Sequence, residues 1–168
     1  MRLLIALISG GRKDNPYPNE KKCEDVCDLL FRSGEGADKK DEDCFIKMLS
    51  TKSLAEVAMI ARIYQRKYKM NLIDVVEKLF SGDMKELVST VLQTIVNPEM
   101  YFAKKIKYAI EKKEHKVLIR ILVSRSEVDM TQIKRCYQKL YNNKMSEDIR
   151  DKFSGDYGEL LAAICKEE

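Results

Sequence analysis

The sequence predicts an all-α protein made of two copies of one five-helix unit. Similar residues recur along the chain at an offset of 73, the separation of Ser53 from Ser126. Apolar residues follow one another at spacings of three and four, which places them on one stripe of a helix. The 168 residues include only seven glycines and three prolines, which suits helices joined by short connections. No segment shows a strand pattern.

The offset pairs residues of the same kind without a gap, which indicates an internal repeat. Phe80–Asp83 recurs as Phe153–Asp156. Further pairs are Tyr64-Gln65 with Tyr137-Gln138, Tyr68 with Tyr141, Phe45-Ile46-Lys47 with Leu118-Ile119-Arg120, and the apolar stripe Met84, Leu87, Val88, Val91 and Leu92 with Tyr157, Leu160, Leu161, Ile164 and Cys165. The chain therefore divides into a helix tail and linker at 1–19, one unit at 20–96 and a second at 97–168.

Start and stop signals bound the helices within each unit. Ser53 with Glu56 forms a capping box, and Ser126 with Asp129 offers a related cap at the matching bend. An Asn-Pro pair at 97–98 separates the two units. The predicted helices span 20–33, 41–50, 53–68, 71–80 and 81–96 in the first unit, and 98–111, 114–124, 127–141, 145–152 and 155–165 in the second.

Composition limits the function classes. A hydrophobic content of 45% suffices for a core, and a net charge of +4 permits contact with anionic lipid or nucleic acid without requiring either. The five cysteines form no C-x-x-C pair, so reduced thiols and an intracellular compartment are expected rather than disulfides or zinc. The apolar run at 3–8 is too short to span a bilayer, and we interpret it as the end of a packed helix.

Three segments carry a resemblance to a known family. LIRILVSRSEVD at 118–129, Tyr-Gln-Lys-x-Tyr at 137–141 and SGDYGELLAAIC at 154–165 resemble the last repeat of an annexin. Residues 20–95 resemble the repeat before it, and LLIALISGGRKDN at 3–15 resembles the end of the second repeat with its linker. The chain thus resembles the C-terminal half of an annexin core.

The resemblance implies a right-handed superhelical repeat of four bundled helices with the third lying across them. It places the loops that join helices one to two and four to five on a convex, membrane-facing surface. It also implies peripheral, calcium-dependent binding to acidic phospholipids from the cytoplasm. Nothing in the sequence suggests an enzyme, because no catalytic set can be assembled around the single histidine, His115. Nucleic-acid binding is not expected.

The usual calcium residues of the family are absent here, so we expect its calcium coordination to fail and assign no cofactor. The G-x-G-T positions hold Ala37–Lys40 in the first unit and Ile110–Lys113 in the second. The closing carboxylate, three residues before the glycine of the later loop, is replaced by Leu79 and Lys152. Calcium takes six to eight oxygen ligands, which neither leucine nor lysine can supply.

Two hypotheses about these loops stay open. An acidic cluster could form an irregular metal site, or could simply favour a helix N-terminus; its members are Glu35, Asp38, Asp41 and Glu42. Lysines on the loops could pair directly with anionic headgroups, or could be solvated as exposed lysines usually are; these are Lys39, Lys40, Lys112, Lys113 and Lys152. The alternative function is a calcium-independent scaffold with cytoskeletal partners or with copies of itself.

Overall fold

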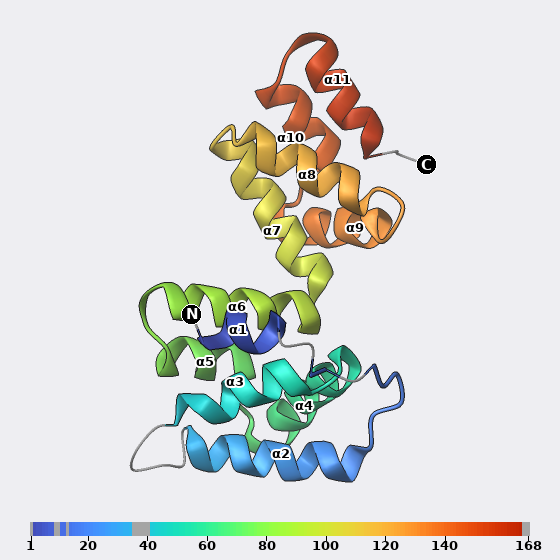
Figure 1. The fold of residues 1–168 in the computed structure, drawn as a ribbon. Coiled ribbons are helices and arrows are strands. Elements are labelled where there is room, and N and C mark those ends of the chain that lie inside the picture. The colour runs from blue at the N-terminus through green and yellow to red at the C-terminus, as the bar shows by residue number, and fades with distance from the viewer. Residues whose placement is uncertain (1, 9–10, 13, 35–40, 166–168) are drawn as a thin grey trace. The chain divides into compact units, whose positions relative to one another are not determined.

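The computed structural model describes residues 2–8, 11–12, 14–34 and 41–165. That part of the chain holds eleven α-helices and no strand, as the sequence predicts (Figure 1). The helices fall into two compact units, Met1–Val96 and Asn97–Glu168, each with its own apolar core. The four residues Glu35, Asp38, Lys39 and Lys40, which carry part of both loop hypotheses, lie outside the described residues.

The described residues of the first unit form six helices: α1 (Arg2–Ile8), α2 (Glu20–Ser33), α3 (Glu42–Thr51), α4 (Leu54–Tyr68), α5 (Leu72–Leu79) and α6 (Gly82–Val96). Helix α1 packs against α3, and α4 contacts α2, α5 and α6. The predicted capping box starts α4: the Ser53 hydroxyl accepts from the Glu56 amide at 3.1 Å, and the Glu56 carboxylate accepts from the Ser53 amide at 2.9 Å. The unit is thus built around α4.

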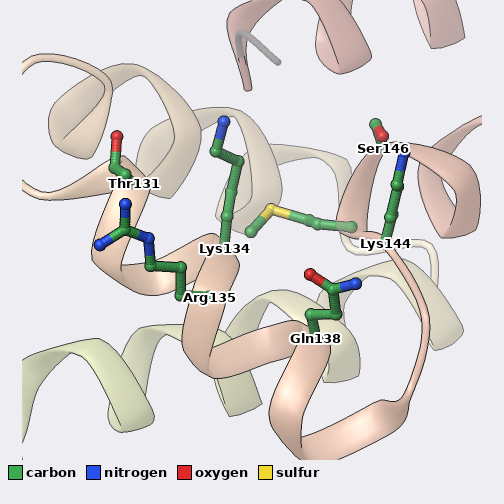
Figure 2. A pocket seen from close by; sticks show the side chains of 7 residues that line it. Thr131, Lys134, Arg135, Gln138, Lys144 and Ser146 are labelled. Carbon is green, nitrogen blue, oxygen red and sulfur yellow. The ribbon is translucent and has the colours of Figure 1, made fainter. Parts of the chain in front are cut away.

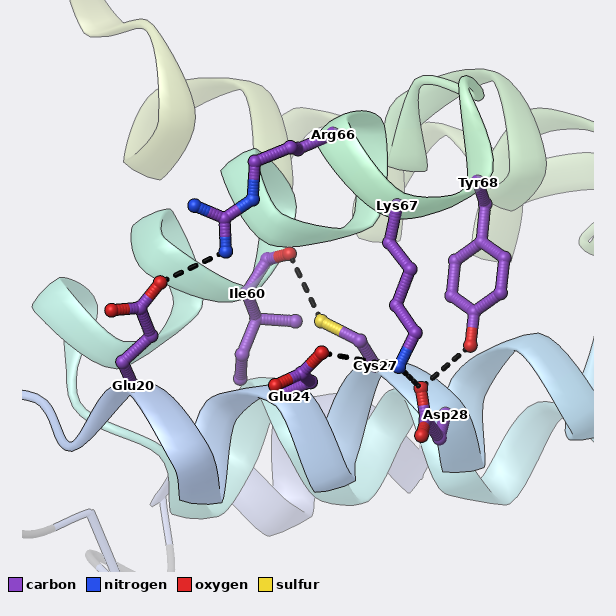
Figure 3. Close-up of polar contacts among 8 residues, drawn as sticks. All are labelled: Glu20, Glu24, Cys27, Asp28, Ile60, Arg66, Lys67 and Tyr68. Carbon is purple, nitrogen blue, oxygen red and sulfur yellow. Dashed lines mark hydrogen bonds and ion pairs between the residues drawn. The ribbon is translucent and has the colours of Figure 1, made fainter.

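Polar contacts join α2 to the end of α4 beside a buried thiol (Figure 3). Lys67 Nζ and Tyr68 Oη each lie 2.6 Å from Asp28 Oδ1, and these hydrogen bonds lower the pKa of Asp28. The pairs are open to solvent, where such contacts add little stability. Between the same two helices the Cys27 thiol donates to the Ile60 carbonyl at 3.3 Å, and burial raises the pKa of the thiol to about 12. This thiol is protonated at neutral pH and acts as a packing group.

In the second unit, residues 97–165 form five helices: α7 (Pro98–Glu111), α8 (His115–Arg125), α9 (Met130–Tyr141), α10 (Met145–Lys152) and α11 (Gly155–Ile164). Contacts run from α8 to α7, from α7 to α10, from α10 to α11 and from α11 back to α8. This closed ring is a four-helix bundle. Helix α9 contacts α7 and α10, so it covers one side of the bundle.

The internal repeat extends to the backbone conformation. Lys69 and Asn142 end α4 and α9 in the left-handed region, with φ of 57° and 53°. Gly82 and Gly155 begin α6 and α11 with φ of 55° and 67°, which glycine adopts at little cost. Both pairs are separated by the offset read from the sequence. The backbone therefore adopts the same conformation at equivalent positions of the two units.

The tyrosines of the third helices repeat as a packed pair. The rings of Tyr64 and Tyr68 lie 5.0 Å apart in α4, and those of Tyr137 and Tyr141 lie 4.9 Å apart in α9. Tyr64 and Tyr137 are fully buried. The repeated tyrosines therefore make the same ring contact in both units.

Asp148 on α10 ties three elements of the second unit together. Lys107 of α7 lies 2.7 Å from Asp148 Oδ2, and Tyr137 of α9 donates to the same oxygen. Asn143 donates to Oδ1 at 2.6 Å. Burial acts to raise the pKa of Asp148, but the three hydrogen bonds outweigh it and the pKa is lowered. The carboxylate is therefore charged and fully engaged inside the unit.

The predicted cap at Ser126 is wrong. Ser126 has helical backbone angles, and its hydroxyl donates to the Val123 carbonyl at 2.9 Å instead of receiving an amide. The Asp129 carboxylate is held by Arg125 at 2.6 and 2.8 Å, so it caps nothing either. With both capping groups engaged elsewhere, α9 begins at Met130 rather than near 127.

The apolar stripe predicted for the last helix is also corrected. Leu161 and Cys165 are buried as expected, but Leu160 is 61% exposed. Gly158 takes part in the buried face of α11. A Cβ atom at Gly158 would lie 1.9 Å from the Phe153 carbonyl oxygen. The close approach of α11 to the Phe153 backbone therefore requires glycine at this position.

Candidate functional site

The bend between α7 and α8 exposes two of the predicted lysines. Lys112 is the C-cap residue that follows α7, and Lys113 comes next in the left-handed region with φ of 55°. Both side chains are exposed. The turn is tight because the Glu114 amide donates back to the Ala109 carbonyl at 2.9 Å. The bend thus presents two adjacent positive charges on a rigid, closed turn.

Two backbone carbonyls of the 110–113 stretch already accept hydrogen bonds inside this bend. The Lys113 amide donates to the Ile110 carbonyl at 3.3 Å, and the His115 amide donates to the Lys113 carbonyl at 3.0 Å. Helix α7 continues to Glu111, so half of the expected G-x-G-T stretch is helical. A calcium loop instead opens its backbone so that several carbonyl oxygens converge. This half-helical, closed turn therefore differs from an open calcium loop.

The bend between α10 and α11 carries the third described lysine. Lys152 is the last residue of α10 and is exposed, and the next residue, Phe153, is buried. Gly155 then turns the chain into α11. At the position where a carboxylate would complete a calcium shell, the molecule therefore places a solvated ammonium group.

His115 joins the two bends. Its Nδ1 lies 2.9 Å from Tyr157 Oη, and its ring packs against Phe153 and Tyr157 with centroids 5.2 and 5.4 Å apart. The bend that carries Lys113 and the bend that carries Lys152 are thus neighbours. His115 is solvent-exposed, yet it contacts Tyr157 and Phe153. These contacts were not predicted from the sequence. The available signal was an aromatic pair at 153 and 157 beside a second helix start.

The two described residues of the acidic cluster, Asp41 and Glu42, lie at the start of α3. The Asp41 carboxylate accepts from the Asp43 amide at 2.9 Å and caps α3. Glu42 lies in the first turn of α3, where negative charge is favourable. Leu79, at the position of the closing acid, packs against the apolar core. These contacts support the simpler of the two interpretations of the acidic cluster.

The residues present do not fit calcium at the second unit. Its two bends offer two internally bonded carbonyls, three exposed lysines and no closing carboxylate. Within the described residues, no group of three or more metal-ligating side chains comes together. In the same part of the chain, no helix is long and apolar enough to cross a membrane.

Comparison with known proteins identifies relatives across the whole chain. Residues 27–91 and 101–164 match the sequence profile of the family described as Annexin. Annexin A1 of Bos taurus is 32% identical over 166 residues, which cover 98% of this chain and 48% of that protein. Annexin A7 of Homo sapiens is 33% identical over 165 residues, which cover 97% of this chain and 34% of that protein. The chain thus spans about half or less of the curated relatives it matches.

Solved structures agree with the sequence comparison. Annexin III superposes with a TM-score of 0.87 at 25% identity, covering 99% of this chain and 52% of that chain. Chicken annexin V superposes with a TM-score of 0.81 at 28% identity, covering 99% of this chain and 53% of that chain. The chain therefore belongs to the annexin family and carries two of its repeats.

Proposed function

We propose that this chain binds acidic phospholipid surfaces peripherally, inside the cell, with weak or no dependence on calcium. The contact is made by lysines of the helix bends: Lys112, Lys113 and Lys152 in the second unit, with Lys39 and Lys40 in the first. The chain acts as a binding module and not as an enzyme. Membership of the annexin family supports the lipid surface as the target, because the family binds such membranes with calcium.

The observation that carries this proposal is the replacement of the calcium cradle by lysines on two neighbouring bends. Lys112 and Lys113 share one exposed turn, and the His115 contacts bring that turn beside the bend of Lys152. Each lysine near an anionic bilayer contributes about 1 kcal/mol, so three contribute about 3 kcal/mol, or roughly a hundredfold in affinity. Such attachment is reversible and weakens with salt.

Vesicle sedimentation tests the proposal. The chain is mixed at low salt with phosphatidylcholine vesicles or with vesicles that also contain phosphatidylserine, in a calcium chelator or in calcium. We expect binding to the serine-containing vesicles alone, with nearly equal amounts in both conditions. The variant Lys112→Gln, Lys113→Gln, Lys152→Gln should bind about a hundredfold more weakly. Absence of binding at low salt with the chelator present would refute the proposal.

A matched control separates the bends from net charge. Lys21, Lys22 and Lys69 are exposed lysines outside the bends, and the triple change to Gln removes the same charge. This control should lose much less affinity than the bend variant. Equal losses would show that overall charge, and not the bends, drives attachment.

A self-associating scaffold is the second candidate, favoured by exposed apolar side chains on two helices that pack together. Ile119 and Val123 of α8 are 40% and 57% exposed, and Leu160 of α11 is 61% exposed. Apolar patches on a surface commonly mark interaction sites. Sedimentation velocity should then show a concentration-dependent increase in mass, which Val123→Ser with Leu160→Ser should reduce. A monomer at all concentrations would argue against this candidate.

A further inference from the structure

A small hollow of mixed charge lies between the start of α7 and the outer face of α9, inside the second unit. Its volume is about 220 Å³, which is below the usual range of drug-sized sites and suits a ligand of few atoms. The lining residues are Asn97, Glu99, Gln132, Arg135, Cys136 and Lys139. Two of these side chains carry a positive charge and one carries a negative charge. The hollow is therefore positive on balance, with both signs present.

Helix periodicity brings the α9 residues of the hollow onto one stripe. Gln132, Arg135, Cys136 and Lys139 are spaced at i, i+3, i+4 and i+7. Cys136 is half-buried, whereas the other three are exposed. In Figure 2 the Arg135 side chain leaves α9 on the side away from Lys144. The stripe therefore presents a guanidinium, an ammonium group and an amide around a recessed thiol.

The start of α7 supplies the other wall of the hollow. Asn97 is the N-cap residue of α7, and its side chain accepts from the Met100 amide at 3.1 Å. Glu99 follows in the first turn of the helix and is half-buried. Contacts between α7 and α9 hold the two walls together. A carboxylate from α7 and two cations from α9 therefore line one hollow.

The surroundings of the Cys136 thiol show that charges of both signs lie close to it. Burial raises the pKa of this thiol and Glu99 raises it further, whereas Lys139 and Lys104 lower it. The thiol is thus protonated at neutral pH and adds no charge. Within the described residues, the side chains of Glu99, Arg135 and Lys139 form no hydrogen bond or ion pair. These three charges are therefore available to a ligand.

We propose that this hollow binds a small acidic α-amino acid of the class of glutamate and aspartate. Such a molecule carries two carboxylates and one ammonium group, which complement the two cations and one carboxylate of the hollow. Arg135 holds one carboxylate in a bidentate manner, and Lys139 attracts the second as a point charge. Glu99 accepts from the ammonium group, and the Gln132 amide donates to a carboxylate.

The serine headgroup of a phospholipid has related chemistry, because it joins an ammonium group and a carboxylate to a phosphate. The position of the hollow favours the free amino acid. The hollow lies at the start of α7, whereas Lys112 and Lys113 follow its end, and a helix of 14 residues is about 21 Å long. A headgroup bound at the bends is therefore distant from the hollow, and the proposal does not rest on membrane binding.

Titration followed by two-dimensional amide NMR tests the proposal, because it detects weak binding at named residues. We expect L-glutamate to shift the Gln132 side-chain amide and the Cys136 backbone amide along one saturable curve. Glutarate lacks the ammonium group, and 4-aminobutyrate lacks one carboxylate. Each should bind at least about tenfold more weakly than glutamate, because each loses a charged hydrogen bond. Equal binding of glutarate, or no saturation by glutamate, would overturn the proposal.

Variants that each remove one charge separate the two ends of the ligand. Arg135→Gln should weaken glutamate binding by about tenfold or more. Glu99→Gln should weaken glutamate binding but strengthen glutarate binding, because it removes a carboxylate that repels the ligand. The controls Arg120→Gln and Glu127→Gln remove the same charges from exposed positions outside the hollow and should bind as the parent does. Equal losses in the controls, or the same response of both ligands to Glu99→Gln, would contradict the assignment.

Two further arms separate a free amino acid from a lipid headgroup and this proposal from membrane binding. Phosphatidylserine vesicles are sedimented with Arg135→Gln and with Arg120→Gln. Equal binding of these two variants supports the free amino acid, whereas a selective loss in Arg135→Gln would overturn it in favour of the headgroup. The bend variant with Lys112, Lys113 and Lys152 changed to Gln should keep full affinity for glutamate. Loss of that affinity would place the ligand at the bends and overturn the hollow.

Discussion

Replacement of Asp148 by Asn removes one charge from the centre of the second unit while it keeps the side-chain shape. In the parent chain the carboxylate accepts from Lys107 and Asn143 at 2.7 and 2.6 Å, and also from Tyr137. Its side chain is only 12% exposed, and that of Lys107 is 24% exposed. An amide can still accept at its oxygen, but it cannot balance the ammonium group.

The expected loss follows from these contacts. Breaking a buried ion pair costs about 3–5 kcal/mol, since the remaining charge is left without a partner. Here Lys107 stays partly solvated and has Glu111 at 3.8 Å, so the cost is reduced to about 2–3 kcal/mol. Urea denaturation followed by circular dichroism at neutral pH measures it as a lower midpoint with an unchanged slope.

The matched control is Asp151→Asn, on the same helix. Asp151 is exposed, and its removal should change the free energy of unfolding by less than about 0.5 kcal/mol. Equal effects of the two changes would refute the reasoning, because they would show that Asp148 acts only through net charge. A loss below about 1 kcal/mol for Asp148→Asn would refute it as well.

The pH dependence gives an independent check with a definite sign. The pKa of Asp148 is lower in the folded chain than in the unfolded chain, so its contribution is complete above the unfolded pKa, which is about 3.9. The contribution is lost as the pH falls through the folded pKa. The stability difference between the parent and Asp148→Asn should therefore be constant near neutrality and shrink in acid.

Two other predictions compare matched positions by the same denaturation assay. Ser53→Ala removes a capping box and should cost about 1 kcal/mol, whereas Ser126→Ala, at the equivalent bend, should cost less than half as much, since its hydroxyl caps no helix. Gly158→Ala forces a Cβ against the Phe153 carbonyl and should cost about 3 kcal/mol, whereas Gly11→Ala meets no atom within 4 Å and should be nearly neutral. Reversal of either order would contradict the corresponding account.

The sequence predicted the helices well because their boundaries depend on neighbouring residues. The Ser53 cap and the glycine turn at Gly155 are encoded within a few positions, and each helix begins there as expected. The predicted cap at Ser126 was wrong because other groups compete for the same side chains. The Ser126 hydroxyl donates to a carbonyl of the preceding helix, and Arg125 binds the Asp129 carboxylate. A pattern states which groups are able to cap, but not which competing partner wins.

Contacts between distant residues could not be predicted in this way. The partners of Asp148 include Lys107, 41 positions away, and the repeat gave no hint of them because the equivalent residue of the first unit is Val75. The contact between α9 and α10 likewise needs the chain reversal at Asn142. Lysine exposure on the bends was predictable, since a lysine is rarely buried. The adjacency of the bends was not.

His115 explains how the two bends stay together in a site that does not fit a metal ion. An ion that binds carbonyls of one bend and a carboxylate of the other also links the two bends. Here a hydrogen bond of 2.9 Å to Tyr157 and ring contacts with Phe153 link the same two bends directly. The link requires no ligand, so we expect Lys113 and Lys152 to keep their relative positions with and without calcium. A calcium-independent membrane contact is therefore consistent with an annexin repeat that retains its fold.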